Sequence, residues 1–463
     1  MGTFPAHALL EIFSFYMDRA REDEWYALVH VCQRWRYVVL GSPRRLNLRL
    51  LCTISSPVRR MLDIWPPLPL VISICAYHPD LSLKHGVSDL IAALGHKDRI
   101  VEIYLFDGSL APQKWKELVG AMQEPLPALK KLQLSSEFCF SLDTESLPAS
   151  FLGGSAPLLQ FLSLNCFSYP AFPKLLSSTR DLVHFELSNL PDSGYISPID
   201  MVACLSSLTT LTKFALEFKS ERHPRQVTRC PFQQERTVLH SLTSFRFKGP
   251  TEYLEDLVAR IDVPRLSRVV VEFVKPIVSG DIRELSQFVG QADNFRLLNQ
   301  ADIIITPPVV DLCLHAGGAS RAWYELIIPC TGWGRIPPIL EHMCLNNTRS
   351  SPPSSLPLSA LEHLVICYED DSWGKPWLTF LPAFTAVKNL YLNEDVLPLV
   401  LPVLKEVTCE STKEVLPALQ NLFLEGYFRI PQPRPVQEAI QEFTTVRRLA
   451  GRPVAVHNWK GWS

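Results

Sequence analysis

The sequence predicts an α/β fold in which a short helical module at the N-terminus precedes an irregular solenoid of repeated strand–helix units. Two observations predict the solenoid: the pattern L-x-x-L-x-L recurs along the chain, and amphipathic helical patterns lie between its copies. A third observation predicts the module, because residues 4–36 contain two short, strongly apolar helical patterns.

Composition narrows the functional classes. The chain has 463 residues and a formal net charge of -2, and we find no dense run of lysine and arginine. No global attraction to nucleic acid or to an anionic membrane is therefore expected. The 12 cysteines are scattered without a C-x-x-C pair, which is typical of buried thiols in a reducing compartment.

The N-terminus does not show the apolar core of a signal peptide. The most apolar windows, residues 65–77 and 396–404, are too short or too rich in proline to span a bilayer, which takes about 20 residues. We therefore expect a soluble protein of the cytoplasm, the nucleus or both, with neither a nucleic acid nor a membrane as partner.

The repeated pattern begins near residue 97 and extends to about residue 430. Its copies recur at intervals of roughly 20 to 30 residues and occupy residues 100–105, 129–134, 159–164, 182–187, 211–216, 242–247, 266–271, 361–366, 387–392 and 419–424. Helical patterns occupy residues 112–123, 197–208, 251–261 and 279–290. Residues 51–96 are interpreted as a connecting or first repeat-like unit.

A short strand followed by a helix at this period resembles the leucine-rich repeat family. That resemblance implies a parallel sheet on the concave face and helices on the convex face. The asparagine or cysteine that usually follows the sixth position is replaced at Phe167, Leu190 and Tyr427. Because that polar side chain normally hydrogen-bonds to the backbone between adjacent coils, we expect degenerate repeats.

Two segments depart from the pattern. Residues 292–356 fit it worst: they suggest two strands joined at Pro307 and Pro308 and then a third strand, so an inserted or distorted unit is expected. Residues 349–358 have the composition of a loop. A helical pattern at 435–451 and a strand candidate at 453–459 predict a C-terminal cap over residues 431–463.

The N-terminal module is expected within residues 1–50. Apolar residues cover more than one face of its first helical pattern, and a stripe with helical spacing runs through Leu28, Val31, Cys32, Trp35 and Val38, which predicts one second helix. A stretch of about 45 residues cannot bury so many large apolar groups internally. Some of them must therefore contact another chain.

These residues resemble the F-box family. Phe4-Pro5 corresponds to its Leu-Pro, residues 9–13 to its first helix, and residues 27–29 with 31–36 to its second. The proline-rich turns of the repeats further resemble fungal F-box proteins. The family implies docking to a Skp-family adaptor, which links it to a cullin-RING ubiquitin ligase, through Pro5, Leu9, Leu10, Ile12, Phe13, Leu28, Val31, Cys32 and Trp35. The alternative is that these residues form the core of a capping helix pair.

Alternation along each predicted strand places the third, fifth and seventh residues of the repeat, Glu102 among them, on the exposed face of the sheet. This face mixes charges of both signs with aromatic rings, which suits protein recognition better than phosphate binding. The alternative is an ordinary solvated face. The candidates for contact with a protein substrate are Tyr104, Phe106, Lys131, Phe161, His184, Lys213, Arg246, Arg268, Tyr391 and Phe423.

Motifs for catalysis are missing from the sequence: it contains no G-x-S-x-G, no H-E-x-x-H, no P-loop and no dinucleotide fingerprint. His342 and Cys344 are the nearest approach to metal-ligand spacing, and a second pair of ligands is missing. We therefore expect no catalytic residues, no cofactor and no metal. The leading hypothesis is a substrate receptor of a ubiquitin ligase, which binds an unidentified protein. The alternatives are a repeat scaffold outside ubiquitin ligation and, more distantly, a hydrolase.

Overall fold

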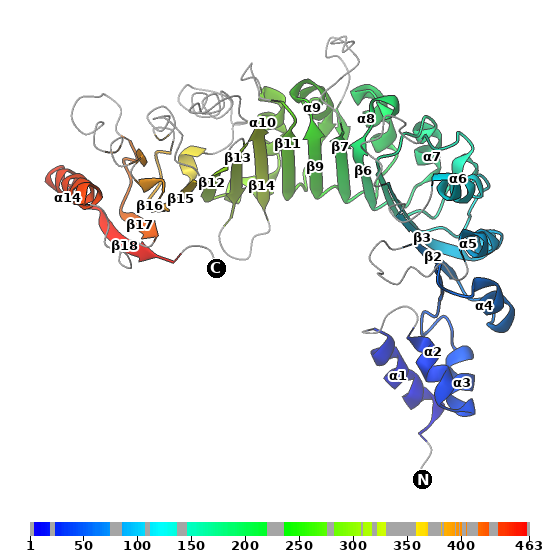
Figure 1. Ribbon diagram of the computed structural model, residues 1–463. Coiled ribbons are helices and arrows are strands. Elements are labelled where there is room, and N and C mark those ends of the chain that lie inside the picture. The colour runs from blue at the N-terminus through cyan, green and yellow to red at the C-terminus, as the bar shows by residue number, and fades with distance from the viewer. Residues whose placement is uncertain are drawn as a thin grey trace. The chain divides into compact units, whose positions relative to one another are not determined.

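The chain forms two compact units in a computed structural model: unit 1 comprises Met1–Ile196 and Ser207–Leu211, and unit 2 comprises Ser197–Ser206 and Thr212–Ser463 (Figure 1). The boundary lies inside the segment interpreted as repeats. The residues that the structure describes are 4–18, 24–74, 86–106, 112–136, 146–219, 236–275, 282–306, 309–316, 322–329, 358–368, 381, 384–393, 395–397, 399–400, 404, 415–425 and 434–460.

Unit 1 begins with three short helices, α1 (Ala6–Met17), α2 (Trp25–Val31) and α3 (Gln33–Leu40). The expectation of one continuous second helix is wrong, because Cys32 is extended (φ -161°, ψ 166°) and separates α2 from α3. The Cys32 Sγ accepts a hydrogen bond from the Trp35 backbone N–H at 3.4 Å and so caps α3. Apolar spacing continues unbroken through this cap, which is why periodicity alone did not reveal it.

The strands of unit 1 form a parallel sheet in chain order. One register row joins Ile103, Leu132, Leu162 and Phe185, all fully buried. The prediction that each repeat contributes one parallel strand is thus confirmed in this unit. Its strands are β1 (Leu50–Cys52), β2 (Leu70–Ile74), β3 (Ile100–Phe106), β4 (Lys131–Ser135), β5 (Phe161–Asn165) and β6 (His184–Leu190).

Helices lie between these strands in the sequence and run beside the sheet in Figure 1. The helix expected from residue 112 is confirmed as α6 (Pro112–Gly120). The other α-helices of this part are α4 (Val58–Ile64), α5 (Val87–Leu94) and α7 (Phe172–Ser178), and the 3-10 turns are η1 (Lys97–Arg99), η4 (Phe151–Gly154) and η5 (Asp192–Gly194). Among the described helices of the whole chain, none combines the length and apolar character that a membrane span requires.

Apolar residues fill the position where regular repeats carry asparagine or cysteine. Phe167 and Leu190 are buried, and the Phe167 ring stacks on Trp115 of α6 with ring centroids 5.6 Å apart. Tyr427 lies outside the described residues. At the two described positions, apolar packing against the neighbouring layer therefore occupies the place of the expected polar side chain.

Unit 2 continues the strand–helix pattern with one reversal. Its strands follow the order β7-β9-β11-β14-β13-β12-β15-β16-β17-β18, with antiparallel pairing only around β13 in this run. They are β7 (Lys213–Phe218), β9 (Ser244–Gly249), β11 (Arg268–Phe273), β12 (Gln300–Thr306), β13 (Val309–His315), β14 (Trp323–Pro329), β15 (His363–Tyr368), β16 (Asn389–Leu392), β17 (Asn421–Glu425) and β18 (Ala455–Trp459).

The reversal confirms the inserted unit expected within residues 292–356. Strand β12 ends at Thr306, β13 begins at Val309, and β14 pairs with β13 in turn, so three strands replace one. The two prolines that join the first pair, the His342–Cys344 pattern and nearly all of the predicted 349–358 loop lie outside the described residues.

The predicted helices of unit 2 form close to their expected positions. They are α8 (Pro198–Ser206), α9 (Thr251–Val258), α10 (Arg283–Gly290) and α14 (Arg434–Leu449), and 3-10 turns occur at η6 (Asp293–Leu297) and η7 (Leu358–Ala360). Helix α9 packs between α8 and α10. The C-terminal helix and strand expected at 435–451 and 453–459 are α14 and β18.

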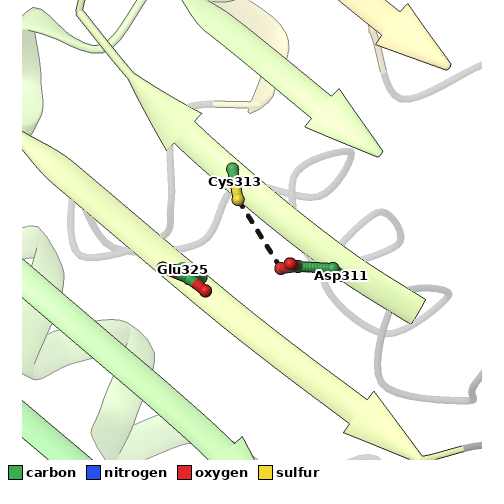
Figure 2. Close-up of side chains that lie close together, drawn as sticks. All are labelled: Asp311, Cys313 and Glu325. Carbon is green, nitrogen blue, oxygen red and sulfur yellow. Dashed lines mark hydrogen bonds between the residues drawn. The ribbon is translucent and has the colours of Figure 1, made fainter. Parts of the chain in front are cut away.

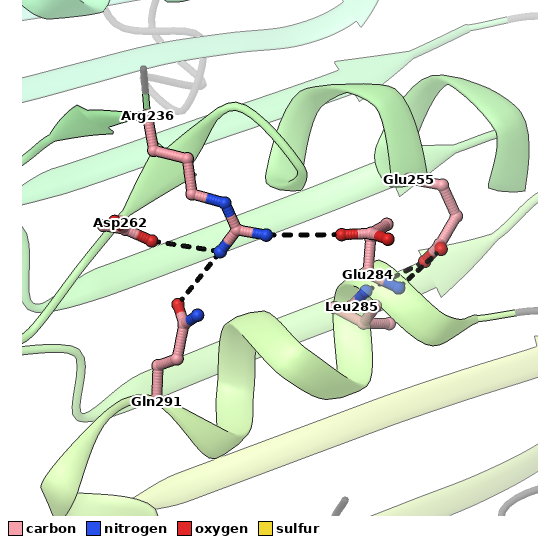
Figure 3. A network of polar contacts seen from close by, with 6 residues as sticks. All are labelled: Arg236, Glu255, Asp262, Glu284, Leu285 and Gln291. Atoms are coloured by element: carbon pink, nitrogen blue, oxygen red, sulfur yellow. Dashed lines mark hydrogen bonds and ion pairs between the residues drawn. The ribbon is translucent and has the colours of Figure 1, made fainter. Parts of the chain in front are cut away.

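A polar network fastens α10 to a two-stranded parallel sheet of β8 (Thr237–Val238) and β10 (Ile261–Asp262) (Figure 3). Arg236 bonds to Asp262 at 3.2 Å, to Glu284 at 3.4 Å and to Gln291 at 3.3 Å. The Glu255 carboxylate accepts the backbone N–H groups of Glu284 and Leu285, which satisfies donors at the start of α10. These contacts join α10 to α9 and to the two-stranded sheet.

The cysteines follow the expectation of buried thiols only in part. The Cys52, Cys204 and Cys313 side chains are buried thiols, whereas the Cys32 thiol is exposed. Burial raises the pKa of the Cys52 and Cys204 thiols to about 11. Cys166 is disulfide-bonded, so the expectation of a thiol is wrong at this position.

Candidate protein-binding surfaces

The core of the N-terminal module forms where its three helices meet. Leu9 and Phe13, one turn apart on α1, are buried, and the Phe13 ring contacts the Trp35 ring edge-on with centroids 4.8 Å apart. Trp25 is fully buried and donates its indole N–H to the Arg49 carbonyl oxygen at 2.8 Å. The module is therefore tied to the chain that leads into β1.

The nine residues predicted to dock an adaptor divide into three classes. Leu9, Phe13 and Leu28 are buried and form core. Leu10 and Trp35 are half-buried, whereas the exposed residues are Pro5, Ile12, Val31 and Cys32. Only the exposed and half-buried residues are available to a partner, and the buried residues hold those contacts in place.

Large apolar side chains concentrate on the outside of this module. On α1, Ile12 is 51% exposed and Phe15 is 62% exposed, and their three-residue separation places them on the same side of the helix. Phe4 and Val31 are also mostly exposed, as is Tyr37 of α3. The exposure of Phe15 and Tyr37 was not predicted from the sequence, because an apolar residue in a dense apolar pattern does not reveal which face of the helix it occupies.

The same module also carries charged side chains that form contacts of their own. The Arg34 guanidinium donates a hydrogen bond to the Phe4 carbonyl oxygen, and Arg45 forms an ion pair with Glu11 of α1. The Arg36 guanidinium lies over the ring of Trp65, 5.6 Å from its centroid. Apolar side chains together with charged ones are the usual composition of a protein interface.

In unit 1 the five predicted substrate-face residues are all half-buried: Tyr104, Phe106, Lys131, Phe161 and His184. The rings of Phe161 and His184, paired across β5 and β6, stack with centroids 4.4 Å apart. The sequence did not predict a chain of polar side chains on β4, β5 and β6, in which Asn189 donates to Asn165 at 2.9 Å and Asn165 donates to Ser135 at 2.8 Å. Strand pairing brings these side chains together although they are far apart in the sequence.

Glu102 corrects the expected exposed face, because its side chain is buried rather than solvated. Its carboxylate pairs with Arg49 at 2.5 Å and with Lys131 at 3.2 Å, and it accepts the Tyr104 hydroxyl at 2.7 Å. Burial alone would raise the pKa of Glu102, but these hydrogen bonds and charges hold it below its usual value. Three larger neighbours thus cover a residue that alternation assigns to the surface.

In unit 2 the three basic candidates, Lys213, Arg246 and Arg268, are exposed on adjacent strands. Arg246 lies 3.6 Å from Glu217, and beside it Lys248 lies 2.6 Å from Glu272. The structure thus places these residues on a sheet face with mixed charge.

The two aromatic candidates of unit 2 form the centre of a ladder of rings. Tyr391 and Phe423 stack nearly parallel, with centroids 4.4 Å apart and an interplanar angle of 9°. His457 stacks on Phe423 at 4.9 Å, and Trp459 meets Tyr391 edge-on at 5.5 Å. Both partners come from β18, so only strand pairing brings them to the predicted pair.

An acidic group of side chains lies on the inserted strands (Figure 2): Asp311 and Cys313 of β13 with Glu325 of β14. The Cys313 thiol donates to the Asp311 carboxylate at 3.5 Å. Burial, and then the charge of Glu325, raise the pKa of Asp311 to about 6, and burial also raises the pKa of Cys313.

One donor atom from each of Asp311, Cys313 and Glu325 lies within 4.8 Å of the others, and a thiolate with carboxylates is a donor set that Zn²⁺ accepts. No metal was expected from the sequence, and this group was not predicted, since no ligand spacing joins β13 to β14. The alternating D-x-C of β13 was the one available signal.

Two histidine–carboxylate pairs bear on the hydrolase hypothesis. His184 lies 3.2 Å from Glu186, and His315 lies 2.8 Å from Asp302. In these described groups Ser188 bonds to the Glu186 carboxylate, and the Cys313 thiol bonds to Asp311, so neither nucleophile bonds to the imidazole. The arrangement differs from a nucleophile activated by a histidine base.

Comparison with known proteins leaves the family open. No protein-family model matches the chain, and no curated protein matches it. One similar solved structure is the leucine-rich repeat-containing protein LegL7 from Legionella pneumophila, which is 14% identical, with 71% of this chain and 94% of that chain covered, at a TM-score of 0.26. A TM-score this low carries no argument, so the repeat architecture rests on the strand pairing described above.

Proposed function

We propose that this chain is a substrate-receptor subunit of a Skp-cullin-F-box ubiquitin ligase. In this proposal residues 1 to about 50 dock a Skp-family adaptor, and the repeats bind a protein that is thereby presented for ubiquitin transfer. The chain itself performs no chemistry, needs no cofactor, and acts in the cytoplasm, the nucleus or both. The supporting resemblance is the ordered set of F-box-like residues in α1, α2 and α3.

One observation carries the proposal: the module keeps large apolar side chains outside although its own core is filled. Ile12 and Val31 are 51% and 59% exposed, while Phe13, next to Ile12, is 1% exposed. Exposed apolar side chains that gather on one small module mark a protein interface, whereas single scattered ones do not. Helices that expose apolar as well as charged side chains suit docking against another helical protein.

The test is co-purification of a Skp-family adaptor with the full chain. Wild type is expected to retain the adaptor, and Ile12→Glu and Val31→Glu to lose most of it, because each places a charge in an apolar contact. Leu158→Glu is the matched control, since Leu158 is a comparably exposed apolar residue outside the module. These exposed sites keep the test separate from unfolding, which substitution of Phe13 would cause.

If the adaptor fails to associate with wild type, or associates equally with the two module variants, the ligase proposal is wrong. A second measurement is ubiquitin transfer in a reconstituted assembly of cullin, RING protein, adaptor and this chain. Transfer to a bound protein is expected with wild type and not with the module variants.

A repeat scaffold outside ubiquitin ligation is the second candidate, because the exposed Ile12 and Val31 side chains suit a protein partner other than an adaptor equally well. In that case the same apolar surface would bind another protein or a second copy of the chain. The test is self-association of the chain in an assay that measures molecular size, with no adaptor present. Self-association of wild type that is lost in Ile12→Glu would favour the scaffold.

A further inference from the structure

A single register row crosses seven strands of unit 2, from β14 to β18 through the inserted strands. Pairing places its members side by side: Glu325, Cys313, Asp302, Val365, Tyr391, Phe423 and His457. Side chains that are paired in register project from the same face of a sheet. This row, which we call the strip, therefore lies on one face of the sheet and has two chemically different ends. Cys313 and Val365 are buried within it, whereas Asp302, Glu325, Tyr391 and Phe423 are half-buried and His457 is exposed.

The aromatic end of the strip is a preformed stack. Tyr391, Phe423 and His457 lie ring against ring at 4.4 and 4.9 Å, and Trp459 closes on Tyr391 from the neighbouring row. Below them, Asn421 donates to Asn389 at 2.8 Å. Because neighbouring rings and amides already fix each other, little side-chain entropy remains to be lost on binding.

The acidic end of the strip gathers three carboxylates from strands β12, β13 and β14. Asp302 and Glu325 belong to the row, and Asp311 lies two residues from Cys313 along β13. In the described part of the chain, neither Asp311 nor Glu325 forms an ion pair with lysine or arginine, whereas Asp302 pairs with His315, and the Trp323 indole N–H donates to Glu325. On the neighbouring strand β11, Arg268 pairs with Trp323, two residues from Glu325.

The dimensions of the strip fit an extended polypeptide. Neighbouring strands are about 4.8 Å apart, so the two steps from Asp302 to Tyr391 cover about 10 Å, and the five steps from Glu325 to Phe423 about 24 Å. An extended chain advances about 3.3 Å per residue, so roughly seven residues reach from one end to the other. A side chain at one end can meet carboxylates while another meets the rings.

We propose that the strip binds an extended polypeptide segment that places arginine or lysine against Asp302, Asp311 and Glu325 and an apolar or guanidinium side chain on the Tyr391–Phe423 stack. Charge complementarity selects a basic segment, and the ring stack takes either an aliphatic side chain or a cation. The carboxylates repel a nucleic-acid backbone. As a statement about the ligase target, this inference rests on the proposed function.

The probe is a fluorescently labelled ten-residue peptide in which arginine alternates with leucine, measured by anisotropy against the full chain. One matched peptide replaces each arginine with glutamate, and another replaces each leucine with glycine. Binding is expected for the first peptide. The glutamate peptide is expected to bind at least about tenfold more weakly and the glycine peptide several-fold more weakly, because each loses one half of the contact.

The protein variants test the two ends separately. Tyr391→Ala and the double variant Asp302→Asn with Glu325→Gln are each expected to weaken binding of the arginine–leucine peptide by about tenfold. Glu217→Gln is the matched control, since Glu217 is a carboxylate on β7 that pairs with Arg246, away from the strip. Thermal unfolding of each variant checks that the sheet stays folded.

Equal binding of the arginine and glutamate peptides, or unchanged affinity in both strip variants, would overturn the proposal. Loss of binding on addition of a chelator would also overturn it, because a metal ion would then occupy the carboxylates. Adaptor co-purification separates the two proposals. If the chain binds the peptide but does not co-purify with an adaptor, the strip proposal is supported and the ligase proposal is wrong. If the chain retains the adaptor but does not bind the peptide, the ligase proposal is supported and the strip proposal is wrong.

Discussion

The N-terminal module and the repeat sheet handle apolar residues in opposite ways. The module buries Phe13, Trp25 and Val39, yet keeps several large apolar side chains outside. Along the described repeats, exposed large apolar residues such as Leu158, Val183 and Leu297 are widely separated in the sequence. A repeat covers its apolar face with the next repeat, whereas a module of about 45 residues has no such neighbour.

The contrast separates two kinds of recognition. A surface of exposed apolar groups suits a permanent or obligate helical partner, because its burial releases water from a large apolar area. The repeat face instead offers ion pairs, stacked rings and amide chains, which select a partner by geometry and charge. The following predictions test whether this difference in burial governs stability as well.

The largest effect on stability is expected for a residue in the buried core of the N-terminal module. Phe13→Ala removes a fully buried ring that contacts Trp35 and should lower the free energy of unfolding of the module by about 3–5 kcal/mol. Ile12→Ala, its neighbour, is exposed and should change this free energy by less than about 0.5 kcal/mol. Denaturant unfolding with hydrogen exchange at α1 amides measures both, and similar losses for the two variants would refute the assigned burial.

An intermediate effect is expected at the buried carboxylate of the sheet in unit 1. Glu102→Ala leaves Arg49 and Lys131 without their acceptor and should cost about 2 kcal/mol, less than a fully buried pair because Arg49 is partly exposed. Because the folded pKa of Glu102 lies below its ordinary 4.5, its contribution is complete above that pH and is lost as the pH falls further.

Unfolding of wild type and of Glu102→Gln between pH 3 and pH 7 measures this contribution. The two stability curves should converge as the pH falls. A difference that stayed constant over this range would show that the pKa of Glu102 is the same in the folded and unfolded states, which would contradict the lowered folded pKa.

The smallest effect, of opposite sign, is expected at the acidic end of unit 2. The raised pKa of Asp311 means that the folded state holds its proton more tightly than the unfolded state does. Wild type should therefore lose stability as the pH rises from about 4 through about 6. Asp311→Asn should stabilise the protein at pH 8 by on the order of 1 kcal/mol, a value reduced for partial solvent screening.

The Asp311→Asn gain should disappear near pH 4, which a series of unfolding curves would reveal. Glu272→Gln is the contrasting control, because Glu272 pairs with Lys248 and its neutralisation should give no gain at pH 8. Stabilisation by both variants would point to the net charge of the sheet rather than to the environment of Asp311.

Particular residues show which structural features could be predicted from the sequence. The leucines of L-x-x-L-x-L units, such as Leu132 and Leu162, predicted strands and burial correctly because side-chain alternation is a property of a single strand. The break at Cys32 and the burial of Glu102 were missed for different reasons. The break at Cys32 depends on a cap inside an apolar pattern. The burial of Glu102 depends on Arg49 and Lys131, which come from two other segments of the chain.

The sequence by itself determined the local units, their order, the inserted strands after residue 292 and the excess of apolar side chains near the N-terminus. Periodicity and composition encode these features within a few consecutive residues. Only the tertiary structure decided which strand faces which, and so placed His457 on Phe423 and Glu325 beside Cys313. Register joins residues that are far apart in the chain, and no local pattern specifies it.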